Sequence, residues 1–279
     1  MNKNAETEWI DGWDKQLEIA EKKEVANVKR FYKQQYSEAI KLFRESGQTS
    51  NFTTVFKRDD FISLYSGIYE RIGFRFASYF RKSYSLIFKE LDTSGFDDIW
   101  KQVFSQLGIR VGEQIAPNLK STTDKTLKTE LTKFLNDPNF IKTNEVDSGR
   151  IISSRFANIA EWQAKRIVRT ESTFVANMGT QQSAKDTFGK NELMKKWKTS
   201  TDERVRSSHA SLHNVKINYT DLFNGIMLVP ADRSNGASAR DVVNCRCRII
   251  LMPKKSVMEA AKLTPQGARQ VQGIIREFT

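Results

Sequence analysis

The stretch that decides the fold class lies in the last third of the chain and reads Trp197-Lys-Thr-Ser-Thr-Asp202-Glu-Arg204-Val-Arg-Ser-Ser-His209-Ala-Ser-Leu-His213. A second short run, Asn244-Cys245-Arg246-Cys247-Arg248, follows it. The protein has only two histidines and two cysteines in 279 residues, and all four fall between positions 209 and 247. Random placement would scatter residues this scarce. Their grouping therefore indicates a local metal site, a polar network or an active site.

The sequence pattern changes at about Lys195, where short strand-like runs begin to alternate with turn residues. The runs that we expect to form strands are 195–199, 215–219, 227–229 and 248–252. A short helix is expected over 202–212, capped by Thr201 or Asp202 and stopped at Asn214. The cap residue Thr264, followed by Pro265, predicts a last helix that runs to residue 278.

The first 190 residues have the spacing of charged and apolar positions that is typical of helices. The ranges that we expect to be helical are 13–43, 61–88, 97–116, 123–135 and 147–189. Pro117 is expected to separate the third from the fourth, and Asn136-Asp-Pro138 to end the fourth. The predicted fold class is therefore α+β: a helical N-terminal region over residues 1–150, followed by a small mixed α+β domain over 151–279.

The segment from Phe61 to Phe88 contains nine aromatic residues. Most of them repeat at three- and four-residue steps, which predicts one buried helix face. Phe74 and Tyr84 fall on other faces. We interpret this surplus as a docking surface for a partner protein.

The formal net charge is +12, and it is unevenly distributed. Residues 190–276 contain 16 lysines and arginines against 7 acidic residues, whereas residues 1–48 contain 9 of each. The basic C-terminal part is expected to face a polyanion such as nucleic acid, although ordinary solubility charge is the alternative. No apolar run of 18 residues and no secretory signal occur, and two cysteines two positions apart are no disulfide framework. We expect the chain to fold in a reducing cytoplasm and to contact no membrane.

His209 and His213 would share one helix face, so that a His2Cys2 zinc site with Cys245 and Cys247 is one hypothesis. The alternative is that no cofactor binds and that these side chains are buried core groups. A third hypothesis makes one of the cysteines a nucleophile, with His209 as its base and Asp202 as the orienting group.

Several arginines accompany these residues, and the six that we consider are Arg166, Arg169, Arg204, Arg206, Arg246 and Arg248. Arg169 lies two residues before Glu171, and Arg204 two residues after Asp202. For these two arginines we favour ion pairs that hold the small domain together. For Arg246 and Arg248 the choice between structural pairing and phosphate contact stays open.

Three ordered motifs in this part of the chain resemble the phage head morphogenesis family, that is, Mu protein F-like minor head proteins. They are Arg166-Ile-Val-Arg169-Thr-Glu171; Lys196-Trp197 with the run from Asp202 to His209; and Asn244-Cys-Arg-Cys-Arg248. By this likeness the family-motif positions are Arg169, Glu171, Trp197, Asp202, Arg204, His209, Asn244, Cys245, Arg246 and Cys247.

The resemblance implies a phage or prophage minor capsid protein, located inside the virion head near the portal vertex and in the host cytoplasm during assembly. Its expected partners are the portal protein, other capsid or scaffolding proteins and, through phosphate contacts, packaged DNA. Residues 1–150 would then supply the docking surface for the portal or scaffold. The alternatives are a zinc-dependent hydrolase or nuclease built on the His/Cys cluster, and a free-standing DNA-binding protein of prophage origin.

Overall fold

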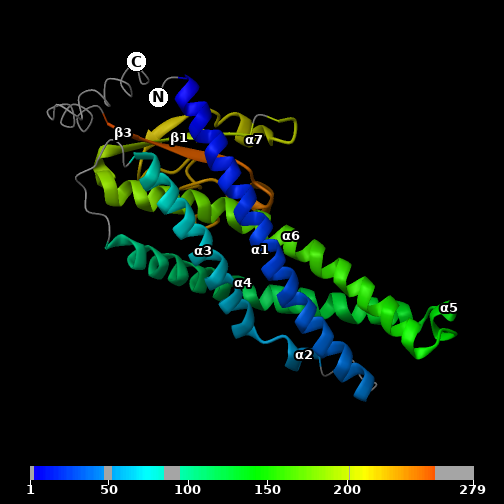
Figure 1. The fold of residues 1–279 in the computed structure, drawn as a ribbon. Helices are drawn as coiled ribbons and strands as arrows, with labels where there is room; N and C mark the ends of the chain where they lie inside the picture. Colours follow the sequence, from blue (N-terminus) through cyan, green and yellow to red (C-terminus); the bar gives the residue numbers. More distant parts are fainter. Residues whose placement is uncertain (1–2, 47–51, 85–94, 201, 255–279) are drawn as a thin grey trace. The chain divides into compact units, whose positions relative to one another are not determined.

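The computed structural model describes residues 3–46, 52–84, 95–200 and 202–254 (Figure 1). The long helices are α1 (Lys3–Ser46), α3 (Arg58–Tyr84), α4 (Phe96–Leu135) and α6 (Glu145–Phe188). The short helices are α2 (Phe52–Val55), α5 (Pro138–Ile141), α7 (Ser207–Ala210) and α8 (Ala239–Val242), with a 3-10 turn at Lys190–Glu192. The strands are β1 (Leu193–Lys198), β2 (Lys216–Asn218) and β3 (Arg248–Pro253).

The predicted α+β class is confirmed. The strands form one antiparallel sheet in the order β2-β1-β3, with Lys196 of β1 opposite Lys216 of β2 and Ile250 of β3. Every residue of β3 is buried, and β1 is covered on most of its length. The sheet lies along the C-terminal part of α6 (Figure 1).

The strand predicted over residues 227–229 is wrong, because only a single bridge between Phe223 and Met227 forms there. The backbone groups of Leu228 are bound by side chains instead. Its N–H donates to Asp232 at 3.0 Å, and its carbonyl accepts from the Lys195 ammonium at 2.7 Å. Because the N–H and the carbonyl of Leu228 are both bound by side chains, they are not used for hydrogen bonds to a neighbouring strand.

The helix predicted over residues 202–212 is reduced to the single turn α7. Asp202 accepts a hydrogen bond from the backbone N–H of Arg204 at 3.1 Å, which makes a local turn before the helix rather than a helix cap. Arg206 is extended (φ −66°, ψ 147°) and takes the N-cap position. The stop at Asn214 is confirmed, since this residue has a φ of 67°.

The break predicted at Pro117 is also wrong, because α4 continues through that residue. A proline inside a helix costs about 3 kcal/mol, mainly through a lost backbone hydrogen bond. Burial of Ala116 on one side and of Leu127 and Leu131 on the other fixes both halves of the helix. The predicted end of α4 before Pro138 is confirmed, and Asp137 caps α5 there through the N–H of Asn139.

Residue contacts group the chain into two compact units, each assembled from separate segments. Unit 1 comprises Met1–Glu21, Tyr69–Phe104 and Arg169–Thr279, and unit 2 comprises Lys22–Ile68 and Ser105–Val168. The domain boundary predicted at residue 150 falls inside the continuous helix α6 and stays a prediction. The helix predicted over 264–278 lies outside the described residues.

Unit 1 contains the sheet and the segments of α3 and α6 that pack beside it. Gly73 of α3 and Gly179 of α6 allow this close packing: a Cβ at Gly179 would lie 2.5 Å from the carbonyl oxygen of Gly73. A Cβ at Gly73 would fall into the ring of Phe104. At this crossing only glycine fits.

Unit 2 is helical and has an aromatic core. Tyr36 stacks on Tyr32 and contacts Phe56 and Phe156, with ring centroids 5.0–6.2 Å apart. The Tyr36 hydroxyl donates to the side-chain oxygen of Gln163 at 2.6 Å. This core therefore combines packed aromatic rings with buried polar side chains such as Gln163.

The two aromatic residues that the sequence suggested as a docking surface are partly buried by contacts within the chain. Phe74 packs against the buried cluster of Ala77, Trp100 and Phe104. Tyr84 stacks on Phe80, with centroids 4.5 Å apart, and its hydroxyl donates to the carbonyl of Leu251. Within the described residues, no helix has a stretch long and apolar enough to cross a lipid bilayer.

Candidate functional site

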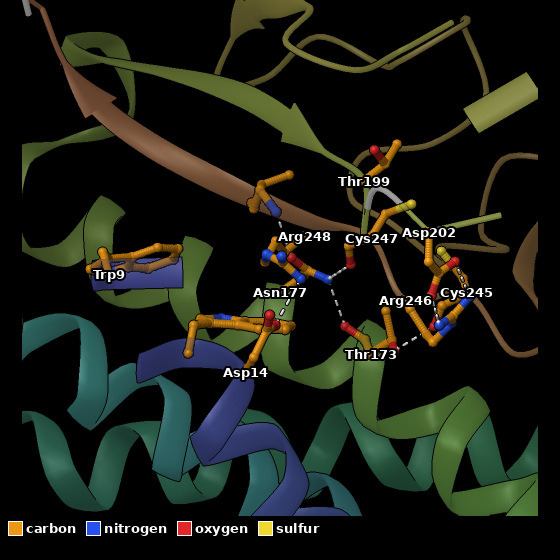
Figure 2. Close-up of polar contacts among 12 residues, drawn as sticks. Trp9, Asp14, Thr173, Asn177, Thr199, Asp202, Cys245, Arg246, Cys247 and Arg248 are labelled. Atoms are coloured by element: carbon orange, nitrogen blue, oxygen red, sulfur yellow. Dashed lines mark hydrogen bonds and ion pairs between the residues drawn. The ribbon is translucent and has the colours of Figure 1, made fainter. Parts of the chain in front are cut away.

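A row of polar side chains on α6 holds the Asn-Cys-Arg-Cys run in place (Figure 2). Thr170, Thr173 and Asn177 are three and four residues apart, so that they lie on one face of the helix. The Thr170 hydroxyl accepts from the N–H of Asn244 at 3.4 Å, and the Thr173 hydroxyl donates to the carbonyl of Cys245 at 2.6 Å. All three side chains are buried.

Asn177 takes the place of a neighbouring strand for the start of β3. Its amide nitrogen donates to the carbonyl of Cys247 at 3.2 Å, and its amide oxygen accepts from the N–H of Ile249 at 2.8 Å. The amide nitrogen also donates to the carbonyl of Thr173 at 2.7 Å. Because buried backbone groups need partners, this one side chain fixes the register of β3 against α6.

Asn244 gives the motif its turn. Its φ is 55°, in the left-handed region that asparagine tolerates better than most residues. The turn follows α8 and directs the chain so that Cys245 and Cys247 both point inward, just before β3 begins. The asparagine therefore has a conformational role, and its side chain is exposed.

The structure brings His209, Cys245 and Cys247 together. The Nδ1 atom of His209 lies 3.7 Å from the sulfur of Cys245 and 3.5 Å from the sulfur of Cys247. The three potential ligand atoms all lie within 4.8 Å of one another. The residues are only 1–3% exposed, and the Nε2 atom of His209 has no hydrogen-bond partner among the described residues.

The two cysteines share a proton unequally. A hydrogen bond from the Cys247 thiol lowers the pKa of Cys245 well below its ordinary value, against the opposing effect of burial. The same hydrogen bond, together with burial, raises the pKa of Cys247. The pair therefore favours one thiolate, held beside the arginines at positions 246 and 248.

His213 does not belong to this cluster. Its Nδ1 atom lies 2.7 Å from the hydroxyl of Thr199, at the end of β1. Burial lowers the pKa of His213, and neighbouring Lys198 acts in the same direction. Of the four ligands predicted for a zinc ion, the structure assembles three.

The ion pairs differ from those expected between sequence neighbours. Glu171 is buried and binds Arg233 at 2.7 Å and the hydroxyl of Tyr69 at 2.5 Å, rather than Arg169. Residues i and i+2 of a helix point to different faces, so that Arg169 and Glu171 diverge. Arg169 is exposed.

The two arginines left open by the sequence both form ion pairs (Figure 2). The two terminal guanidinium nitrogens of Arg246, Nη1 and Nη2, bind the carboxylate of Asp202, which lowers the pKa of that carboxyl. Arg248 is buried beside the ring of Trp13 and binds Asp14 at 2.7 Å. Arg204 contributes its backbone N–H to Asp202, so that the predicted Arg204–Asp202 side-chain pair is replaced by Arg246–Asp202.

Trp197 is fully buried and holds the His209 ring. The two rings meet edge to face with centroids 5.3 Å apart, and Phe223 packs on Trp197 at 5.0 Å. The lysines on either side of Trp197, Lys196 and Lys198, both bind Glu6 of α1.

Among the remaining arginines, Arg206 donates to the carbonyl of Val243, and Arg166 lies over the ring of Trp162.

The arrangement does not match the predicted nucleophilic triad. Asp202 is bound by Arg246 and does not orient His209. A base without an orienting partner lacks the third member on which such a mechanism depends. What the geometry offers is a buried imidazole with two sulfurs at its Nδ1 atom.

Half of the chain matches a known protein family. The model of the Phage Mu protein F like protein family matches residues 111–250, which is half of the chain and ends within β3. No curated protein and no solved structure matches the chain significantly. The chain belongs to the Mu protein F like family of phage head morphogenesis proteins, and the predicted family is confirmed.

Proposed function

We propose that this chain is a minor head protein that acts at the portal vertex, in capsid assembly and in DNA packaging or ejection, without catalysing a reaction. The observation that carries the proposal is how the motif residues are used. Glu171, Trp197 and Cys245 are buried in packing and hydrogen bonds. Asn244 makes a turn. Residues used in this way stabilise a fold and leave little for turnover of a substrate.

Burial of the His/Cys cluster argues in the same direction. A hydrolase needs an open coordination position that substrate can reach. The side chains of His209, Cys245 and Cys247 are almost entirely covered. This favours a structural role over the hydrolase or nuclease alternative.

A protein partner would find exposed apolar side chains in unit 2. Trp162 of α6 is 60% exposed, and the end of α4, the start of α6 and α5 between them add further positions. These positions are Leu135 (50% exposed), Ile141 (66%) and Val146 (65%). Exposed tryptophan and large aliphatic residues are frequent at protein interfaces. We assign portal or scaffold docking to these exposed positions.

The proposal includes only weak binding to DNA. Within the described part of residues 190–254, most cationic side chains make internal contacts: Lys195, Lys196, Lys198, Arg206, Arg233, Arg246, Arg248 and Lys254. Exposed cationic residues in the same part are Lys190, Arg204, Lys216 and Arg240. Each phosphate contact contributes roughly −0.9 to the slope of log K against log salt. We expect weak, sequence-tolerant binding with a shallow slope.

The test is co-assembly with the portal protein encoded in the same phage or prophage. The full chain is co-expressed with that portal protein, and complexes are separated by size and quantified. We expect the chain to co-purify with the portal, and Trp162→Ser combined with Ile141→Ser to reduce the bound fraction at least tenfold. Ile99→Ser, a similarly exposed apolar change in unit 1, serves as the control and should bind normally.

Two results would overturn the proposal. One is the finding that the chain binds no portal or capsid component under any condition. The other is a His209→Ala variant that folds and assembles fully but loses a measurable hydrolysis of DNA or protein. Normal portal binding by the Trp162 and Ile141 double variant would reject only the assigned surface.

A further inference from the structure

Three buried ligand atoms converge on one point in unit 1: Nδ1 of His209 and the sulfurs of Cys245 and Cys247. A neutral imidazole carries a single lone pair, and here it faces two sulfurs at nearly equal distances, 3.5 and 3.7 Å. The symmetry of the arrangement is that of a shared central ion.

The distances have the size that a metal ion requires. Zinc bonds of about 2.3 Å to sulfur and about 2.0 Å to nitrogen, at a tetrahedral angle, place sulfur and nitrogen about 3.5 Å apart. The two observed distances fall within about 0.2 Å of that edge. With Nδ1 bound to the ion, the proton of the His209 ring would lie on Nε2, which has no hydrogen-bond partner among the described residues.

The surroundings hold the three ligands in place. Thr173 fixes the backbone of Cys245 and Asn177 that of Cys247, while Trp197 packs against the His209 ring. Two thiolates, each with a charge of −1, would balance the charge of a divalent cation, so that the buried site carries no net charge. Soft thiolate ligands with one imidazole select zinc over magnesium or calcium.

We infer that His209, Cys245 and Cys247 are the protein ligands of a structural zinc ion that joins the segment around α7 to the start of β3. Binding displaces the thiol protons to solvent, and among the described residues the cluster supplies three protein ligands. The inference concerns the stability of unit 1 and is independent of the proposed role at the portal.

The experiment is elemental analysis of the full chain, purified without chelators, followed by replacement of the metal with Co²⁺. We expect about one zinc per chain. Co²⁺ should give the intense near-ultraviolet absorption of thiolate ligation and visible bands typical of tetrahedral geometry. Cys245→Ser and Cys247→Ser should each lower the zinc content at least tenfold.

His213→Ala is the matched control, because it removes the other histidine, which lies outside the cluster. This variant should keep its zinc and its cobalt spectrum. Absence of metal in the native chain together with no thiolate absorption on adding Co²⁺ would overturn the inference, and so would zinc retained in both serine variants. Because the cobalt spectrum is recorded on the native chain, a serine variant that fails to fold still leaves the inference open to refutation. Loss of portal binding with the metal unchanged would reject the proposed function alone.

Discussion

The two units of this protein are stabilised by different chemistry. Unit 2 has an aromatic core in which Tyr36 contacts Tyr32, Phe56 and Phe156. Unit 1 instead buries many polar groups between α6 and the sheet. Five of these buried polar residues are Thr173, Asn177, Glu171, Lys195 and Arg248.

This difference indicates where substitutions will be tolerated. An aromatic core accepts changes that keep volume and shape. A buried polar network does not, because removing one partner leaves another group without a hydrogen bond, at a cost of about 1–3 kcal/mol. Five residues of the family motifs lie in the second kind of core: Glu171, Trp197, His209, Cys245 and Cys247.

The largest effect is expected from Glu171→Gln. The change keeps the shape of the side chain but removes the charge that pairs with Arg233 and accepts from Tyr69. Breaking a buried pair from one side costs about 3 kcal/mol. Urea unfolding followed by circular dichroism measures the loss. Glu161→Gln, in the exposed pairs with Lys29 and Lys165 of unit 2, is the control and should change stability far less. Equal losses would contradict the comparison.

Asn177→Ala should cost somewhat less, about 2–3 kcal/mol. The change leaves the carbonyl of Cys247 and the N–H of Ile249 without this partner in a buried setting. Hydrogen exchange should show faster exchange at Ile249 and along β3. Asn158→Ala, an exposed asparagine of the same helix, should change neither stability nor exchange. Unaltered protection of β3 in the Asn177 variant would show that the amide does not hold the strand.

The sequence predicted the helical and strand content well where periodicity is strong, and it grouped the histidines and cysteines by their scarcity. It failed where the deciding contact is distant in the chain. Asn177 and Arg233 were not singled out from the sequence, although Thr170, Thr173 and Asn177 repeat at three- and four-residue steps, which places them on one helix face. Adjacency misled the pairing of Glu171, because side chains two apart on a helix diverge.

The errors at Pro117 and at residues 202–212 have a similar cause. Local preferences favour a break at a proline and a helix after an acidic cap. In unit 2 burial on both sides of Pro117 outweighs the first preference. In unit 1 Arg246 binds Asp202 from 44 residues away, which draws the predicted cap residue out of a helix start.

A pH dependence should distinguish the two cores further. Burial lowers the pKa of Lys195 to about 8. Between pH 8 and the unfolded pKa of about 10.5, the unfolded chain binds the proton that the folded chain has released, so that stability rises with pH. The stability of the native chain relative to Lys195→Met should therefore increase from pH 7 to pH 10, by about 1 kcal/mol after solvent screening. A constant difference across this range would show that Lys195 stays charged in the fold.

The smallest effect is expected from Tyr36→Phe in unit 2. The change removes the hydroxyl that donates to Gln163 at 2.6 Å and keeps every ring contact. A neutral hydrogen bond contributes about 1 kcal/mol to stability, and the change leaves only one group, the Gln163 side-chain oxygen, without this partner. Urea unfolding should therefore detect about 1 kcal/mol or less. Tyr36→Ala also removes the ring and should cost several times as much. If Tyr36→Phe proved as damaging as Asn177→Ala, the aromatic core would depend on its polar groups as unit 1 does, and the distinction between the two units would no longer hold.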